Sequence, residues 1–385
     1  IGISGSGLMH LKMRLFEMPN RSLLLTGSYN PNTTSPLNEE SLHYTDQEWL
    51  IDLYRQTYWS VLYDFPIENN WDESQSVNVM FTPASKDRAI SKVFEWLESE
   101  EEQILLMMFS LRNLTSKDES ETLTQLLKRK VEAGVTVAVI TDQKQSDGID
   151  AEGKPIFYDD PTEDALRGAG IPVYEVINRL TPYTAMHHKV AILGQTQVRV
   201  ISGASNWTKS GLGSGGRLAR NVESVLFIDS ARLDQNETGY RYLGQWIRIL
   251  RRYEEYSLER GTSPSVSSMI NQLWSQDHWP ELSLHIEASG VEIADHERVM
   301  IGGSPITLGQ WDVNELISMA PRISDQSEWV SEKLWFPIGQ IVPWKFAITD
   351  ERGRFKYWES GQDRNAEVYL PLSRSSSMLW SGEWR

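Results

Sequence analysis

The sequence contains no cysteine among its 385 residues. It can therefore form no disulfide, no thiolate metal site and no cysteine nucleophile, and cysteine usage leaves the redox compartment unreadable. No apolar run approaches the roughly 20 residues that a transmembrane helix needs, so no membrane-spanning segment is expected. Positive charge is also scarce, because 37 Lys and Arg stand against 53 Asp and Glu and the net charge is −16. A nucleic-acid binder usually displays a basic face, so DNA or RNA is the less favoured partner.

The length allows two or three domains, and the composition is that of a soluble globular protein, with 40% hydrophobic and 23% charged residues. The chain begins at Ile1 without a charged-then-apolar leader. A secreted, plastid or cytoplasmic location is therefore left open.

The strongest signal is an internal repeat. Three blocks recur in the same order: MHLK at 9–12 and MHHK at 186–189, TGSYN at 26–30 and SGASN at 202–206, and NEES at 38–41 and NVES at 221–224. The offsets between the copies are 177, 176 and 183 residues. Matched blocks at a nearly constant offset predict two copies of one structural unit. We expect the two copies to share one site.

The repeated residue types suit one kind of chemistry. Cleaving a phosphodiester without a metal requires a nucleophile, a proton donor for the leaving oxygen, and positive charge near the phosphoryl oxygens. A neutral imidazole can attack phosphorus while a protonated one donates a proton, and lysine and asparagine side chains can bind the oxygens. Residues i and i+2 of a strand face the same side, so His10 and Lys12 are expected to project together, as are His187 and Lys189. No metal-ligand spacing is present among the histidines.

These motifs resemble the phospholipase D superfamily, whose signature is His-x-Lys-x-x-x-x-Asp followed by Gly-Ser-x-Asn. The resemblance implies that two copies meet across a pseudo-twofold axis, that one histidine forms a phosphohistidine, and that the other acts as acid and then base. It implies no cofactor and no metal. The matching catalytic positions are His10, Lys12, Asn30, Glu40, His187, Lys189, Asn206 and Glu223. The two glutamates correspond to the acids that orient the histidines, and His10 is the preferred nucleophile, although the reverse assignment stays open.

The chain departs from the family signature at two kinds of position. The family's Asp falls on Glu17 in the first copy and on Gly194 in the second, and Ala204 takes the family's Ser position. A degenerate, inactive copy of the fold is therefore an open alternative.

Strand-like and helix-like segments alternate between the two copies. Strands are expected at 77–82, 104–111, 135–141, 171–176, 189–193 and 198–202, and helices at 87–102, 121–133 and 240–259. This alternation predicts an α/β fold with α-β-α layers and a mixed, largely parallel sheet. Only nine residues precede His10, so we expect the first copy to be N-terminally truncated.

The C-terminal hundred residues follow a different pattern. After a Gly- and Ser-rich stretch at 261–268, short alternating strands rich in Trp predict an all-β sandwich. The segments IGGS at 301–304, LGQWD at 308–312, WKF at 344–346, WES at 358–360 and the terminal WR resemble the starch-binding modules of carbohydrate-binding family 20. The resemblance implies that Trp311 and Trp358 stack on sugar rings, whose C–H faces suit a flat indole, and that Lys345, Glu359 and Asp363 contact hydroxyl groups.

The sequence thus predicts a first repeat at 1–70, a second at 71–260, a linker at 261–283 and a starch-binding module at 284–385. The expected function is metal-independent cleavage of a phosphodiester, with a phospholipid or a glucan-associated compound as substrate and an α-glucan such as starch or glycogen as partner. A non-catalytic glucan-binding scaffold and a nuclease of the same superfamily are the alternatives.

Overall fold

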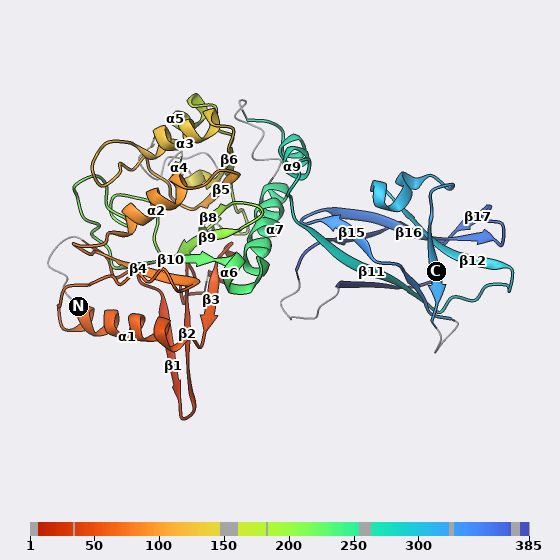
Figure 1. Cartoon of the computed structure of the whole chain (residues 1–385), viewed down its shortest axis with the longest axis horizontal. Coiled ribbons are helices and arrows are strands. Elements are labelled where there is room, and N and C mark those ends of the chain that lie inside the picture. Colours follow the sequence, from red (N-terminus) through yellow and green to blue (C-terminus); the bar gives the residue numbers. More distant parts are fainter. Residues whose placement is uncertain are drawn as a thin grey trace. The chain divides into compact units, whose positions relative to one another are not determined.

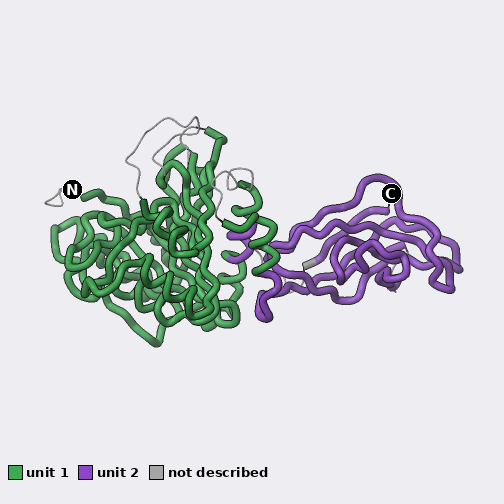
Figure 2. Tube along the Cα trace, turned by 90° about the horizontal axis from the view of Figure 1, so that it is seen from above, with its two compact units in different colours: residues 1–242, 248–272 green, residues 243–247, 273–385 purple. Residues whose placement is uncertain are grey.

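The computed structural model describes residues 7–33, 35–146, 161–181, 184–253, 263–322, 327–370 and 378–384. Residues 254–262, which include the end of the expected helix over 240–259, lie outside these ranges, as does Arg385. The chain forms two compact units (Figure 2): unit 1 contains residues 1–242 and 248–272, and unit 2 contains residues 243–247 and 273–385. We describe each unit by itself.

A seven-stranded sheet forms the centre of unit 1 (Figure 1), with strand order β4-β10-β9-β8-β5-β6-β7. Its strands are β4 (Val77–Thr82), β5 (Gln103–Met108), β6 (Thr136–Asp142), β7 (Val173–Val176), β8 (Lys189–Leu193), β9 (Arg199–Gly203) and β10 (Glu223–Asp229). The predicted mixed sheet is confirmed, but parallel pairing is limited to β5, β6 and β7, and the other four pairings are antiparallel. The antiparallel pairings arise because the tight turn at Gly194 (φ +78°) makes β9 run back along β8. Strand β10 then pairs antiparallel with β9.

Helices connect these strands or follow the last of them, and α7 and α9 extend into the residues of unit 2. They are α2 (Ala89–Glu98), α3 (Leu123–Glu132), α4 (Gln143–Ser146), α5 (Thr162–Gly168), α6 (Ser230–Asp234), α7 (Glu237–Arg252) and α9 (Val266–Trp274). Apolar residues of α2 and α3, such as Val93 and Leu126, are buried together with strand residues such as Leu106. Helix α9 lies in the stretch that composition predicted as a linker, because Met269, Ile270 and Leu273 are buried.

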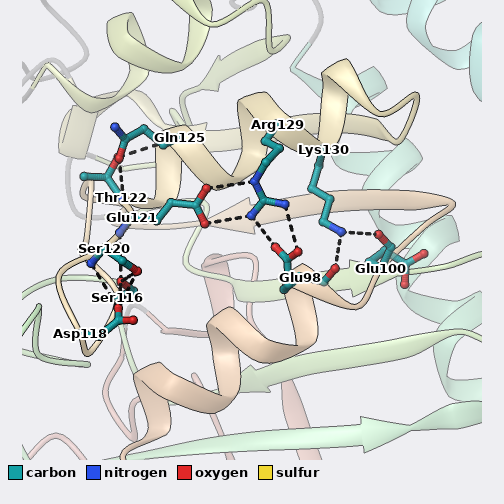
Figure 3. A network of polar contacts seen from close by, with 10 residues as sticks. All are labelled: Glu98, Glu100, Ser116, Asp118, Ser120, Glu121, Thr122, Gln125, Arg129 and Lys130. Atoms are coloured by element: carbon teal, nitrogen blue, oxygen red, sulfur yellow. Dashed lines mark hydrogen bonds and ion pairs between the residues drawn. The ribbon is translucent and has the colours of Figure 1, made fainter.

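Polar contacts fix the ends of α2 and α3 (Figure 3). Thr122 and Gln125 form a reciprocal capping box at the start of α3, which explains why this helix begins two residues later than predicted. Near its end, Arg129 pairs with Glu98 of α2 and with Glu121 at 2.6 and 3.0 Å. The cap contributes on the order of 1 kcal/mol. Exposed ion pairs of this kind contribute less, about 0.2–1 kcal/mol each.

The first copy of the repeat contributes a smaller sheet. Strands β1 (Met13–Met18), β2 (Arg21–Gly27) and β3 (Leu42–Thr45) pair antiparallel in that order; the 3-10 turn η1 (Ser35–Leu37) precedes β3 and helix α1 (Glu48–Leu62) follows it. This is the same succession as β8, β9, β10 and α7. A tyrosine of each helix reaches the equivalent strand: the Tyr54 hydroxyl lies 3.0 Å from Thr26 Oγ1, and the Tyr242 hydroxyl lies 3.4 Å from Ser202 Oγ.

Unit 2 is a β sandwich, which confirms the predicted all-β module. Its elements are β11 (Glu281–Ser289), β12 (Glu297–Gly303), the 3-10 segment η3 (Ile306–Trp311), β13 (Ile317–Pro321), β14 (Trp329–Ser331), β15 (Leu334–Pro337), β16 (Ile341–Asp350), β17 (Phe355–Trp358), β18 (Arg364–Glu367) and β19 (Met378–Glu383). Pairing is antiparallel throughout the described strands except between β11 and β19. The core contains Trp329, Phe336, Trp344 and Phe346. Across both units, no helix of the described part is long and apolar enough to cross a membrane.

Candidate active site and aromatic surface

The two copies of the repeat meet through reciprocal backbone pairing. Met9 bridges to Val222, and Met186 bridges to Glu39, both in parallel register. The peptide N–H of His10 donates to the Val222 carbonyl at 3.0 Å, and that of His187 donates to the Glu39 carbonyl at 2.9 Å. The first His-x-Lys segment ends just before β1 and the second ends on Lys189, the first residue of β8, and each lies beside the acidic block of the other copy.

The side chains repeat this exchange. His10 Nδ1 lies 2.6 Å from Glu223 Oε2, and His187 Nδ1 lies 2.8 Å from Glu40 Oε2. In each pair the imidazole comes from one copy and the carboxylate from the other. Each glutamate therefore fixes the ring orientation of a histidine that is distant in sequence, by 147 residues for Glu40 and His187 and by 213 residues for Glu223 and His10. With Nδ1 bound to a carboxylate, Nε2 is the nitrogen left for chemistry.

Further donors hold the two glutamates. Asn38 Nδ2 donates to Glu40 at 3.2 Å, and Asn221 Nδ2 donates to Glu223 at 3.1 Å. Ser28 Oγ also donates to Glu40 at 2.5 Å. The two asparagines open the repeated NEES and NVES blocks, so the sequence carried a signal for them, although their role was not predicted.

The two lysines are buried and equivalent. Lys12 Nζ donates to the His10 carbonyl at 2.8 Å, and Lys189 Nζ donates to the His187 carbonyl at 2.7 Å. Burial lowers the pKa of Lys12 to about 8 and the pKa of Lys189 to about 7, although the nearby charges of Glu40 and Glu223 act to raise both pKa values. Burial therefore favours the neutral amine of both lysines more than in an exposed lysine.

The two histidines differ in environment. His187 is buried, and its ring lies edge-on to Phe109, 4.5 Å between centroids, whereas the His10 side chain is 22% exposed. Burial lowers the pKa of His187 well below its ordinary value, and the charges of Lys189, Lys12 and His10 act in the same direction. Burial raises the pKa of Glu40, while the Ser28 hydrogen bond opposes this shift. His187 is thus a neutral imidazole near pH 7.

The two asparagines of the motif lie in different surroundings. Asn30 lines a cavity of about 210 Å³ together with His10, Lys12, Arg14 and Tyr29. Asn206 begins the turn after β9, and its buried Oδ1 accepts no hydrogen bond from any described residue. The structure therefore brings Asn30 to the His10 side of the site.

The two positions that replace the family's Asp lie at strand ends. Glu17 is exposed near the end of β1 and pairs with Arg55 at 3.1 Å. Gly194 forms the turn after β8, where an added Cβ would lie 2.8 Å from the Gln197 carbonyl oxygen. Glu17 bonds to Arg55 and the Gly194 carbonyl accepts from Gln103, so among the described residues neither position is hydrogen-bonded to the histidines, lysines or glutamates of the site.

One buried acid was missed by the sequence analysis. Asp142 ends β6, is completely buried, and accepts the Met186 N–H at 3.0 Å through Oδ2, next to His187. Burial raises the pKa of Asp142 to about 7. No repeat marks this residue, so only the fold reveals it. The described residues contain no group of three or more His, Asp or Glu arranged to hold a metal ion.

Unit 2 carries an aromatic pair at its surface. Trp311 and Trp358 lie 5.6 Å apart between ring centroids at an interplanar angle of 75°. Trp358 packs on β12 at Gly302, where an added Cβ would lie 2.4 Å from the indole. Beside the pair, Lys345 Nζ donates to the Gly361 carbonyl at 2.6 Å and lies 3.7 Å from Asp363.

Glu359 differs from the sequence-based expectation. Its side chain has no exposed area, and its carboxylate accepts two hydrogen bonds from Arg364, at 3.0 and 2.6 Å, and one from the Phe346 N–H. A direct contact with a sugar hydroxyl is therefore not expected in this geometry. Glu359 instead holds Arg364 and the segment that follows Trp358.

Two family descriptions match the sequence. The family described as cardiolipin synthase, PLD-like domain, matches residues 93–239, and the starch binding domain family matches residues 282–377. Both resemblances drawn from the motifs are therefore confirmed. No curated protein matches the chain.

Several solved structures are similar to parts of the chain. Nuc from Salmonella typhimurium, a phospholipase D family member, is 21% identical over 46% of this chain and 94% of its own, with a TM-score of 0.33. NucT from Helicobacter pylori is 17% identical over 46% and 95%, also at 0.33. The gamma-CGTase from alkalophilic Bacillus clarkii is 22% identical over 27% of this chain, with a TM-score of 0.25, and the match spans 15% of that enzyme's length.

Proposed function

We propose that this protein, which contains a phospholipase D-like domain and a starch-binding domain, is a metal-independent phosphodiesterase that works while bound to α-glucan. One observation carries the proposal. Each catalytic histidine is oriented by a glutamate of the other repeat, His10 by Glu223 and His187 by Glu40. This leaves two Nε2 atoms as reactive groups of one site, as a double displacement at phosphorus requires.

The environments of the histidines favour a division of labour. His187 is neutral near pH 7, and its Nδ1–H donates to Glu40, so Nε2 has a free lone pair for attack on phosphorus. His10 is the more exposed ring, and its Nδ1 lies 2.6 Å from Glu223, so its Nε2 is the nitrogen left to transfer a proton. His187 is therefore the nucleophile and His10 the acid, which reverses the preference drawn from the sequence.

The reaction proceeds in two balanced steps. His187 Nε2 forms a bond to phosphorus while the bond to the leaving alkoxide breaks, and the His10 Nε2–H proton passes to that oxygen. His10 then removes a proton from water, whose oxygen attacks phosphorus and breaks the phosphorus–nitrogen bond. Lys12 and Lys189 stabilise the charge on the non-bridging oxygens in both steps, and Asn30 and Asn206 supply amide donors.

The substrate is a phosphodiester found with α-glucan, either a phosphorylated glucan-associated compound or a phospholipid. Indole rings set at an angle can stack on successive sugar rings of a curved glucan chain, and the half-buried Trp311 and Trp358 meet at 75°. Lys345 and Asp363 lie beside them and contact hydroxyl groups. Binding of this kind raises the local concentration of any phosphodiester on the same particle.

A nuclease of the same superfamily is a second candidate, and one observation favours it. Lys12 and Arg14 line the cavity beside His10, and none of the described residues that line this cavity is acidic. Such a surface suits a phosphate backbone.

Turnover in chelator tests the enzymatic proposal. The full chain is incubated with bis(p-nitrophenyl) phosphate, a glycerophosphodiester and single-stranded DNA in excess EDTA. We expect turnover that falls by about 10³-fold or more in His187→Asn and is retained in His296→Asn, a matched change in unit 2. Quenching in alkaline detergent is expected to trap a phosphohistidine in the wild type, and brief acid treatment is expected to remove it. Absence of turnover on all three substrates would leave a glucan-binding scaffold, and turnover on DNA alone would establish the nuclease.

Retention on insoluble starch tests the glucan site separately. Trp311→Ala is expected to release the protein, while Trp335→Ala, which removes an exposed indole of unit 2, is expected to keep it bound. Equal retention of the two variants would refute the assignment of Trp311.

A further inference from the structure

A second polar cleft lies beyond the carboxyl ends of β5 and β9, the two strands that flank β8 in the central sheet. Its volume is about 500 Å³, and it is formed by three segments: Arg112 and Asn113 after β5, Pro161, Thr162 and Ala165 at the start of α5, and Thr208, Lys209 and Ser210 after β9. The proposed reaction uses none of these residues. None of the described residues that line the cleft is acidic, although the whole chain carries a net charge of −16.

Main-chain contacts connect the cleft to the catalytic groups. The Phe109 N–H donates to the His188 carbonyl at 2.7 Å, and the Phe109 ring contacts His187. Arg112 follows three residues later, and its N–H donates to the Trp207 carbonyl at 2.9 Å. Lys209 likewise follows Asn206 by three residues. Three residues of chain span at most about 11 Å, so the Cα atoms of Arg112 and Lys209 lie within that distance of the Cα atoms of Phe109 and Asn206.

The cations of the cleft are held in different ways. The Arg112 guanidinium donates to the carbonyls of Leu111 and Gln145 at 2.9 and 3.1 Å, which fixes its plane. Arg220 does not line the cleft, but its Nη2 donates to Ser210 Oγ of the lining at 3.0 Å. Lys209 is exposed and forms no ion pair with another described residue. The cleft thus combines the positioned guanidinium of Arg112, hydroxyl groups and the exposed ammonium of Lys209, which together suit a phosphate.

We infer that this cleft binds a second phosphate group of the substrate, one that is separate from the phosphodiester being cleaved. The inference rests on the proposed function, because it assigns a role to the cleft relative to the reacting phosphate. It narrows the substrate to compounds with a phosphomonoester or a second phosphodiester next to the scissile one. A phosphorylated glucan or headgroup and a nucleic-acid strand both offer such a group, and the experiment separates them.

The test compares substrate pairs that differ by one phosphate. One pair is dithymidine monophosphate with and without a 5′-phosphate, and the other is glycerophosphoinositol with and without a 4-phosphate. KM and kcat are measured for the full chain and for two charge reversals, Lys209→Glu in the cleft and Lys128→Glu, an exposed residue of α3 whose side chain is 56% exposed. Lys209→Arg checks whether a positive charge at this position is sufficient for the preference for the phosphorylated substrate.

We expect the wild type to favour the phosphorylated member of at least one pair by about tenfold in KM, a size consistent with one charge-assisted contact. Lys209→Glu is expected to remove this preference, whereas Lys128→Glu and Lys209→Arg are expected to keep it. The pair that shows the preference identifies the source of the phosphate. A preference that survives Lys209→Glu, or that Lys128→Glu removes equally, would overturn the inference.

Binding measurements separate this inference from the proposed function. Affinities of the same four compounds are measured by calorimetry with the full-length His187→Asn variant, alone and combined with Lys209→Glu. If the wild type shows no turnover but Lys209→Glu still removes a preference in binding, the phosphodiesterase proposal fails and the cleft remains an anion site. If turnover is present and neither KM nor binding responds to Lys209→Glu, the cleft assignment fails and the enzyme proposal stands.

Discussion

Replacing Lys189 by methionine should abolish catalysis and yet stabilise unit 1 at acidic pH. The Lys189 side chain is 1% exposed, and burial lowers its pKa from 10.5 to about 7. At about 1.4 kcal/mol per pK unit, this difference means that burying the charged ammonium costs about 5 kcal/mol wherever the folded state keeps the proton. Methionine has a similar volume and no such cost.

The cost depends on pH in a defined direction. Below pH 7 both the folded and the unfolded chain carry the Lys189 proton, so the full penalty applies. Between pH 7 and 10.5 the unfolded chain binds more protons at this position than the folded chain, so wild-type stability rises with pH and the penalty shrinks. At pH 9 it is about 2 kcal/mol by the same arithmetic. Against this, methionine leaves the His187 carbonyl without its donor, which costs about 1–3 kcal/mol.

The net expectation for Lys189→Met is therefore a gain of about 3 kcal/mol at pH 6 and almost none at pH 9. Urea unfolding followed by hydrogen exchange of the β8 and β9 peptides measures this for unit 1 separately from unit 2. Lys128→Met, at an exposed position, serves as the control and should change stability by less than about 0.5 kcal/mol. A Lys189→Met protein that is less stable than wild type at pH 6, or equally shifted at both pH values, would refute the reasoning.

Three further changes should act through single contacts. Glu223→Gln keeps the shape of the His10 contact but loses its charge, so kcat should fall by about 10²- to 10⁴-fold while far-UV circular dichroism is unchanged; an undiminished kcat would contradict the assigned role. Gly302→Ala places a Cβ 2.4 Å from the Trp358 indole, so the affinity for starch in a pull-down assay should fall at least tenfold without loss of phosphodiesterase activity. Arg364→Met leaves the buried Glu359 carboxylate without its partner and should lower the free energy of unfolding of unit 2 by about 3–5 kcal/mol, seen as a lower urea midpoint; an unchanged midpoint would contradict this.

The sequence predicted local structure best where apolar periodicity is unambiguous. The strands at 77–82 and 189–193 have the predicted bounds, because runs of Val, Ile, Leu and Met between turn residues define buried strands. The sheet was predicted as largely parallel because alternation of helix and strand does not reveal how the β8–β9 hairpin joins it. The segment of α9 was predicted as a linker because its start is rich in Ser, a residue that favours turns and caps over helix interiors. The buried Met269 and Leu273 instead hold it as a helix.

At the site, the sequence named the residue types, but the fold decides their partners. Glu40 and Glu223 were recognised from the repeat. Which histidine each one binds is decided by the fold, because it brings together residues that are 147 and 213 positions apart in the sequence. Asp142 belongs to no repeat and is identified only because β6 ends beneath Met186. Glu359 was expected to contact sugar hydroxyls because of the resemblance to the starch-binding modules, whereas its buried carboxylate accepts hydrogen bonds from Arg364.

The exchange of partners has a consequence for how this site can fail. Since His10 depends on Glu223 and His187 depends on Glu40, neither repeat contains a complete catalytic pair by itself. The backbone bridges Met9–Val222 and Glu39–Met186 hold both pairs at once, so a change that separates the two copies removes the orientation of both histidines together. Losing one glutamate and losing the contact between the copies should therefore have similar effects on kcat, and the two should not add. The departures at Glu17 and Gly194 lie at strand ends, outside the described contacts of these pairs, so they leave this reciprocal geometry in place.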